Sequence, residues 1–190
     1  MTAAGAEVRC RLAAAADHAV LARLFHENAR HYFGDKAPTL DAMTKHLRDE
    51  VLADHANVEI LLAEQVGPGS ASGAVGFASF AVVHPAPDLT GQLFLKDLFV
   101  TAAARSGGIG EALLRALAKI AVERRCSRLD WTAEDYNPRA LALYDRIGAR
   151  RLPEKVYYRI DGAALKAFAG GSDGRLVLRD GPDGPPQDEA

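Results

Sequence analysis

The chain has 190 residues, of which 48% are hydrophobic and 25% are charged, and its formal net charge is −2. These values are typical of one globular domain with a sizeable core. A near-neutral balance argues against a dedicated nucleic-acid-binding protein, which usually carries a strongly basic face. We therefore expect no nucleic-acid partner.

Metal sites and membrane segments are not indicated either. The two cysteines, Cys10 and Cys126, lie far apart and form no Cys-x-x-Cys pair, and the six histidines show no metal-ligand spacing with carboxylates. The first eleven residues contain no apolar core of a signal peptide, and no run approaches the roughly 20 apolar residues of a membrane span. We expect a cytoplasmic protein without a metal or a membrane partner.

The first half of the chain predicts a strand, two helices and a hairpin. Asp17 is a candidate N-cap of the first helix, Gly34 ends it, and Thr39 begins the second. From residue 58 the apolar pattern changes to that of strands, interrupted by a Gly-Pro-Gly-Ser turn. The expected elements are strand 7–12, helix 20–33, helix 39–52, strand 58–63, turn 67–70 and strand 73–83.

The second half alternates strands with helices. Residues 93–100 are almost continuously apolar apart from Lys96 and Asp97, as in a central strand covered on both faces. The expected elements are strand 93–100, a helix after the glycines at 107–110, strand 128–133, helix 137–146, strand 155–160 and helix 162–168. This order predicts an α/β fold with a mixed sheet and helices on both faces. We expect a single domain over residues 1–170 and a disordered tail over residues 171–190, which are rich in Gly, Asp and Pro.

A glycine-rich turn joins the strand at 93–100 to a long amphipathic helix. Such a turn presents free backbone N–H groups and the positive end of a helix dipole to an anion. Arg105 can add a charge-assisted contact. Gly110 is followed by Glu111 and Ala112 rather than by Lys-Ser/Thr, which excludes a P-loop, and the Gly-x-Gly-x-x-Gly pattern of a dinucleotide site is absent. A loop that only turns the chain is the alternative.

This turn resembles the acetyl-CoA motif of GNAT-superfamily N-acetyltransferases, Arg/Gln-x-x-Gly-x-Gly/Ala. Arg105, Gly108 and Gly110 fill its fixed positions. The resemblance implies a mostly antiparallel twisted sheet, and it implies that the CoA pyrophosphate lies on the backbone amides of the turn. It also implies that the pantetheine arm pairs with the strand edge. The implied cofactor-binding residues are Phe99, Val100, Arg105, Ser106, Gly107, Gly108, Ile109, Gly110 and Asn137.

A second stretch, residues 136–149, resembles the other motif of the same superfamily. Asn137 occupies the helix-capping position, Tyr144 lies two turns later, and Gly148-Ala149 ends the helix. The resemblance implies that Asn137 binds CoA and that Tyr144 protonates the departing CoA thiolate as a general acid. From the residues alone, Tyr144 could equally be a core aromatic and Asn137 an ordinary N-cap.

Within the superfamily the chain is most similar to the diamine and polyamine (thialysine-type) N-acetyltransferases. The similarity lies in the segments 26–32, 94–100 and 126–131. That branch usually has Leu-Glu-Asp where this chain has Leu95-Lys96-Asp97, and the Glu has been proposed as a water-mediated base. Asp97 could replace it as the catalytic base or bind the substrate ammonium, or it could be a structural carboxylate. Glu27 is a second candidate for substrate binding.

The sequence therefore predicts an acetyl-CoA-dependent N-acetyltransferase acting on a primary amine of a small molecule, of the polyamine, diamine or amino-acid-like kind. The resemblance also implies a homodimer. Two alternatives stay open: acetylation of a protein N-terminus or lysine, and a domain that binds acyl-CoA without turnover, which Lys96 favours. The sequence does not name the amine.

Overall fold

The computed structural model describes residues 7–66 and 73–170. The chain forms two compact units, Met1–Ala149 and Arg150–Ala190, and each is described by itself. The candidate site lies in the first unit. A single domain over residues 1–170 stays a prediction, and the turn at 67–70 and the tail at 171–190 lie outside the described residues.

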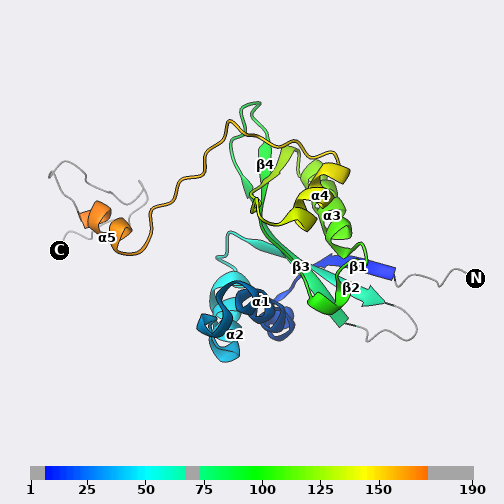
Figure 1. Cartoon of the computed structure of the whole chain (residues 1–190), viewed down its shortest axis with the longest axis vertical. Helices are drawn as coiled ribbons and strands as arrows, with labels where there is room; N and C mark the ends of the chain where they lie inside the picture. Colours follow the sequence, from blue (N-terminus) through cyan, green and yellow to red (C-terminus); the bar gives the residue numbers. More distant parts are fainter. Residues whose placement is uncertain (1–6, 67–72, 171–190) are drawn as a thin grey trace, which may run out of the picture. The chain divides into compact units, whose positions relative to one another are not determined.

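One mixed sheet organises the first unit, with its strands in the order β1-β2-β3-β4-β5 (Figure 1). The strands are β1 (Glu7–Leu12), β2 (Glu59–Val66), β3 (Gly73–Val83), β4 (Gly91–Val100) and β5 (Cys126–Trp131). The first four are antiparallel to their neighbours, and β5 is parallel to β4. The predicted mixed, mostly antiparallel sheet is confirmed, as is the hairpin.

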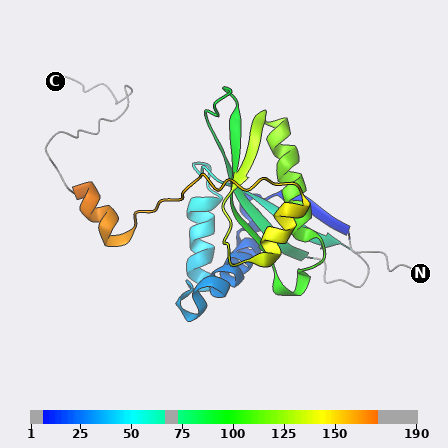
Figure 2. The same ribbon diagram turned by 45° about the horizontal axis from the view of Figure 1, so that its top comes forward.

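Helices cover both faces of the sheet (Figure 2). They are α1 (His18–Phe33), α2 (Leu40–His46), α3 (Ile109–Glu123) and α4 (Pro138–Arg146), with a short π-helical turn after α2 at Leu47–Val51. Leu21 of α1 packs with Leu62, Phe77 and Phe99 in one core cluster. Leu113 of α3 belongs to the other cluster on the opposite face. Alternate residues of each strand supply the two cores, because successive side chains point to opposite faces.

A bulge in β4 resets this alternation. Ser79 pairs with Asp97, but the next residue of β3, Phe80, pairs with Leu95, so Lys96 is the extra residue. Leu95 and Leu98 both contact the core on the α3 side, although in a regular strand residues three positions apart point to opposite faces. The bulge therefore turns Asp97 toward the opposite, α1-side face, which also carries Phe99.

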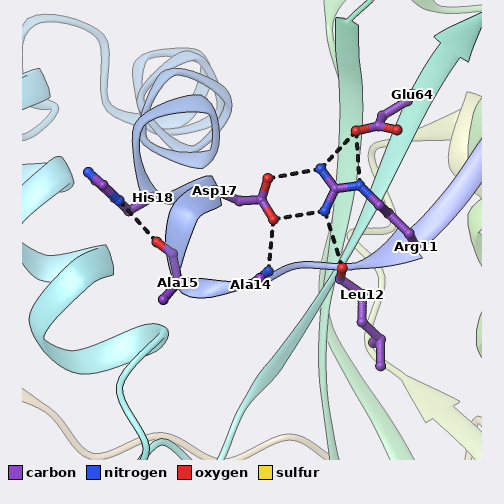
Figure 3. A network of polar contacts seen from close by, with 7 residues as sticks. All are labelled: Arg11, Leu12, Ala14, Ala15, Asp17, His18 and Glu64. Atoms are coloured by element: carbon purple, nitrogen blue, oxygen red, sulfur yellow. Dashed lines mark hydrogen bonds and ion pairs between the residues drawn. The ribbon is translucent and has the colours of Figure 1, made fainter.

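The connection from β1 to α1 is held by a salt-bridge network (Figure 3). Arg11 donates two hydrogen bonds of 2.8 Å to the carboxylate of Asp17 and also bonds Glu64 Oε1 at 2.8 Å. Asp17 Oδ2 accepts a further bond from the backbone N–H of Ala14. Asp17 stands at the N-cap position, as predicted, but its side chain makes no capping bond to the helix because these partners engage it.

Three other differences from the sequence prediction are small or local. Strand β5 lies at Cys126–Trp131 rather than at 128–133, and α1 begins at His18. In the second unit, residues 155–160 form no strand, and the prediction of a last strand there is wrong for this structure. Val156, Tyr157, Tyr158 and Ile160 are exposed, and no neighbouring strand of the second unit's described residues buries them. The helix expected at 162–168 is present as α5 (Gly162–Gly170).

Candidate functional site

The site begins where β4 and β5 separate. Their parallel pairing runs from Gly91 with Cys126 to Leu95 with Trp131 and ends there. Beyond this point β4 continues to Val100 and pairs only with β3. The second half of β4 is therefore an open strand edge inside the sheet, and the Lys96 bulge lies at its start.

The direction of the free amides follows from the β3–β4 register. The N–H of Thr101 donates to Val75 O at 2.9 Å, so this pair is hydrogen-bonded. In an antiparallel ladder the bonded pairs alternate with pairs whose N–H and C=O groups point away. The N–H groups of Leu98 and Val100 thus point to the open side. The N–H of Phe99 points to β3 in this register, and its side chain is buried in the core on the α1 side.

The loop after β4, residues 105–109, is the candidate anion cradle. Ser106 and Gly108 both adopt left-handed conformations, with φ of 74° and 76°. Arg105 before them is extended, and left-handed residues in such a loop can turn backbone N–H groups toward one side, as anion-binding loops do. Helix α3 begins directly afterwards at Ile109, which adds the helix N-terminus. A Cβ built on Gly108 would meet nothing within 4 Å, so the cradle is open at this residue.

Two residues of the motif have roles in packing. Ile109 is 1% exposed, and its side chain lies in the core on the α3 side, so only its backbone can face an anion. A Cβ on Gly110 would lie 3.4 Å from Cδ2 of Leu143. The first turn of α3 at Gly110 thus lies close to Leu143 of α4.

Two arginines flank the cradle. Arg105 is exposed, and its Nε donates to the carbonyl oxygen of Val100 at 3.1 Å. This bond fixes the guanidinium at the end of the open edge. Arg139, in the first turn of α4, donates from Nη2 to Ser106 Oγ at 2.7 Å. The sequence motifs did not single out Arg139, although its position directly after Asn137-Pro138 was a usable signal.

Helix α4 carries the two residues expected from the second motif. Asn137 Oδ1 accepts the backbone N–H of Ala140 at 3.1 Å, so it is a true N-cap. Tyr144 is half-buried, and its ring centroid lies 5.1 Å from that of Trp131 on β5. Burial raises the pKa of the Tyr144 phenol, and the nearby Tyr32 hydroxyl of α1 adds to the rise. Tyr144 thus lies against Trp131, the last residue of β5 that pairs with β4.

Asp97 lies at the bulge with two partners. The hydroxyl of Ser79, itself buried, donates to Asp97 Oδ2 at 2.6 Å. The Lys96 ammonium donates to the same oxygen at 3.0 Å. The Asp97 side chain is 28% exposed and that of Lys96 is 70% exposed. The structure places Asp97 at the start of the open edge of β4, in direct contact with the Lys96 ammonium.

Glu27 is engaged by the backbone. Its Oε1 accepts the N–H of Ala102 at 3.1 Å, which ties α1 to the residues just after β4. Glu27 is exposed, and this bond caps the short helical turn at Ala102–Ala104. Of the predicted site residues, Glu27 is thus the one whose carboxylate already has a structural partner in the backbone.

The open edge of β4 thus leads to the candidate cradle, with two arginines beside the loop and a phenol on α4. The donor set fits a long ligand that ends in phosphates. Within residues 7–66 and 73–170, no group of three His, Cys, Asp or Glu side chains could hold a metal ion. Across the same residues no helix is long and apolar enough to cross a membrane.

Comparison with known proteins places this arrangement in a family. Residues 19–149 match the sequence model of the acetyltransferase (GNAT) family. The thialysine N-epsilon-acetyltransferase of Mus musculus is 27% identical over 172 residues, which cover 87% of this chain and 99% of that protein. The L-ornithine N5-acetyltransferase of Arabidopsis thaliana is 33% identical over 93 residues, 49% of this chain and 41% of that protein.

Solved structures have the same fold as this chain. An integron cassette protein from the mobile metagenome of V. cholerae superposes with a TM-score of 0.79 at 39% identity, covering 86% of this chain and 98% of that one. A probable acetyltransferase superposes with a TM-score of 0.67 at 22% identity, over 82% of this chain and 98% of the other, a likeness of fold alone. The fold class expected from the sequence motifs is confirmed.

Proposed function

Because the chain belongs to the acetyltransferase (GNAT) family and is therefore an acyltransferase, we propose that it transfers the acetyl group of acetyl-CoA to a primary amine of a small molecule. The observation that carries the proposal is the open edge of β4, which leads directly into the cradle before α3. The mouse relative named for thialysine and the plant relative named for L-ornithine both act on small amines, which supports a small-molecule acceptor.

The bound co-substrate would follow the open edge and the cradle. Its pyrophosphate would accept hydrogen bonds from the amides between Ser106 and Gly110, with Arg105 and Arg139 supplying positive charge. Its pantetheine amides would pair with the outward groups of Leu98 and Val100. Asn137 would contribute indirectly, because its capping hydrogen bond fixes the start of α4 beside the cradle.

The chemistry we propose is direct attack. The neutral amine adds to the thioester carbonyl, and the resulting tetrahedral intermediate collapses with cleavage of the C–S bond. Tyr144 donates its phenolic proton to the departing thiolate, and the proton lost by the amine returns to solvent through a base. The raised pKa of Tyr144 suits this role, because it keeps the phenol protonated at neutral and mildly alkaline pH.

Asp97 is the candidate base, although its oxygen Oδ2 already accepts two hydrogen bonds. This engagement favours a second candidate function, in which the domain binds acyl-CoA without turnover. A homodimer, a cytoplasmic location and the absence of nucleic-acid and membrane partners stay predictions.

Thiol release from acetyl-CoA tests the proposal. The wild-type protein and Tyr144→Phe are assayed with polyamines, diamines, amino acids and short peptides, and CoA binding is measured in parallel by calorimetry. We expect release with at least one small amine and a large loss of turnover in Tyr144→Phe, with CoA binding unchanged. CoA binding without release for any amine would contradict the proposal in favour of the non-catalytic function, and release with peptides alone would indicate a protein acetyltransferase.

A further inference from the structure

Strand β1 presents an unpaired edge of the sheet. It is the last strand on its side, and within the described residues it pairs with β2 alone. The N–H of Ala13 donates to Ile60 O at 2.8 Å, so this pair is hydrogen-bonded. Bonded and non-bonded pairs alternate along an antiparallel ladder. The backbone N–H and C=O groups of Val8, Cys10 and Leu12 therefore point away from β2, to the open side of the sheet.

A groove of about 720 Å³ follows the same edge, between β1 and α3. Val8, Cys10 and Leu12 line it from the strand, and the small residues Ala112 and Ala116 line it from the helix, together with charged side chains of α3. None of the three strand residues is charged or a proline, which are features that keep edge strands from pairing. A strand added at this edge would place every second side chain in the groove.

The spacing of the outward groups fits a second copy of β1. Val8 and Leu12 stand two residues before and after Cys10, so two β1 strands that pair antiparallel about a two-fold axis at Cys10 match every outward N–H with an outward C=O. Val8 then lies opposite Leu12 of the partner subunit. The oxygen of Leu12 already accepts a bond of 3.3 Å from Arg11 of its own chain, but a carbonyl oxygen has a second lone pair.

Charge on the other face of β1 favours the same partner. Arg11 is bound to Asp17 and Glu64, one positive and two negative charges, so this network has a formal sum of −1 (Figure 3). Arg9 is exposed and has no ion-pair partner among the described residues. In the antiparallel pairing about Cys10, Arg9 lies directly opposite Arg11 of the partner subunit and thus beside a negatively charged network. The two-fold axis repeats this attraction on the other side of Cys10.

We propose that the β1 edge is a subunit interface, at which β1 pairs antiparallel with β1 of a second copy of this chain about a two-fold axis at Cys10. The two sheets join into one continuous sheet, and the groove-facing side chains of the two strands pack together beside both copies of α3. The proposal does not depend on acetyltransferase activity. It assigns an interface to the homodimer that the sequence predicts.

Sedimentation of the full chain over a series of concentrations provides the first test. We expect a monomer–dimer equilibrium in the wild type. Arg9→Glu places a negative charge beside the partner's network, so it should raise the dimer dissociation constant by about tenfold or more. Arg23→Glu, the same change at an exposed position of α1, is the control and should leave the constant unchanged. A monomer at every concentration, or an equal effect of the two variants, would overturn the proposal.

A variant of the strand itself provides the second test. The N–H of Val8 points away from β2, so Val8→Pro removes a hydrogen bond to the partner and none within the chain. We expect the circular dichroism of the wild type and loss of the dimer. A folded Val8→Pro protein that still dimerises with the wild-type dissociation constant would overturn the proposal, and Arg9→Glu decides alone if Val8→Pro does not fold.

Cross-linking identifies which residues meet at the axis. Cβ atoms directly opposite each other in an antiparallel pair lie about 5 Å apart, so a short bis-maleimide should join Cys10 to Cys10 of the partner subunit. The chain has two free cysteines, so the matched variants are Cys126→Ser, which should cross-link as the wild type does, and Cys10→Ser, which should not. A wild-type dimer that does not cross-link, or one that cross-links in Cys10→Ser, would overturn the proposal.

Discussion

Arg139 in the first turn of α4 donates a 2.7 Å hydrogen bond to the hydroxyl of Ser106, in the loop before α3. Two further contacts join the same helices. Arg146 donates to Glu111 at 3.2 Å, and Cδ2 of Leu143 lies 3.4 Å from where a Cβ of Gly110 would stand. These contacts join helix α4 to the cradle and to α3, and so they couple the position of Tyr144 to the loop that we propose binds the phosphates.

Arg139→Ala should weaken acetyl-CoA binding without affecting the acceptor. The guanidinium is an exposed cation at the cradle, and its removal loses a charge-assisted contact with phosphate, so we expect the KM for acetyl-CoA to rise about tenfold. The measurement is steady-state kinetics at saturating amine. Arg146→Ala is the matched control, since the same residue type on the same helix is already paired with Glu111. A similar rise in both variants would indicate loosening of α4 rather than loss of a phosphate contact.

Tyr144→Phe should lower kcat by about 10²-fold or more, since a positioned general acid contributes on that scale. The pH dependence gives a second signature. The acid works in its protonated form, so activity is present below its pKa and is lost as pH rises through it. Because burial raises that pKa, the alkaline limb of kcat should lie above pH 10, near which a free phenol titrates. This limb should be absent in Tyr144→Phe.

Tyr136→Phe is the control for that experiment. Tyr136 precedes α4 and is 72% exposed, in contrast to the half-buried Tyr144. Its phenol is also influenced by Tyr32, so it lies in the same region. If Tyr136→Phe lowers kcat and Tyr144→Phe does not, Tyr136 rather than Tyr144 is the general acid.

The path of the chain through the first unit was predictable because its determinants are local. Periodicity located every strand of the sheet, and Thr39 and Asn137 were identified as caps that the structure confirms. The strand at 155–160 was predicted by the same local pattern and is absent, because a strand needs a neighbour and the pattern does not supply one.

The site was predictable only in part. Motifs pointed to the cradle and to α4, since backbone conformation and helix caps leave signatures in a few adjacent residues. The bulge at Lys96 left none, because a bulge is defined by the register against β3. The contacts of Arg139 with Ser106 and of Glu27 with Ala102 join residues 33 and 75 positions apart, and no local pattern contains them.

Gly76→Ala should destabilise the protein and disturb the open edge. A Cβ at this position would lie 2.6 Å from the carbonyl oxygen of Phe99, a backbone atom that cannot move without shifting β4. We expect a loss of about 2 kcal/mol in the free energy of unfolding, measured in urea. Gly110→Ala is the control, because its Cβ would meet only the flexible end of Leu143 at 3.4 Å. Equal stability of both variants would show that β3 and β4 can separate here at no cost.

Glu27 can be tested as a structural or a substrate-binding residue. Its carboxylate caps the turn at Ala102, and glutamine can accept the same hydrogen bond without a charge. If the role is structural, Glu27→Gln should keep the KM values of both substrates within about twofold, and Glu27→Ala should raise the KM for acetyl-CoA several-fold. A rise in the amine KM in Glu27→Gln alone would instead support the role in substrate binding expected from the sequence.

The network around Asp17 should make stability depend on pH. Hydrogen bonds from Arg11 and Ala14 hold the pKa of the Asp17 carboxyl below its ordinary value, although burial opposes them. A carboxyl with a lowered folded-state pKa contributes stability above its unfolded pKa, near 4, and this contribution is lost as pH falls through the folded pKa. Asp17→Asn should therefore cost about 2 kcal/mol at pH 7, measured by urea unfolding, and the difference from the wild type should shrink below pH 4. Asp35→Asn is the control, since Asp35 pairs with Arg30 in an almost fully exposed position and should cost little at any pH. A deficit in Asp17→Asn that is the same at pH 7 and pH 3 would show that shape rather than charge holds β1 to α1.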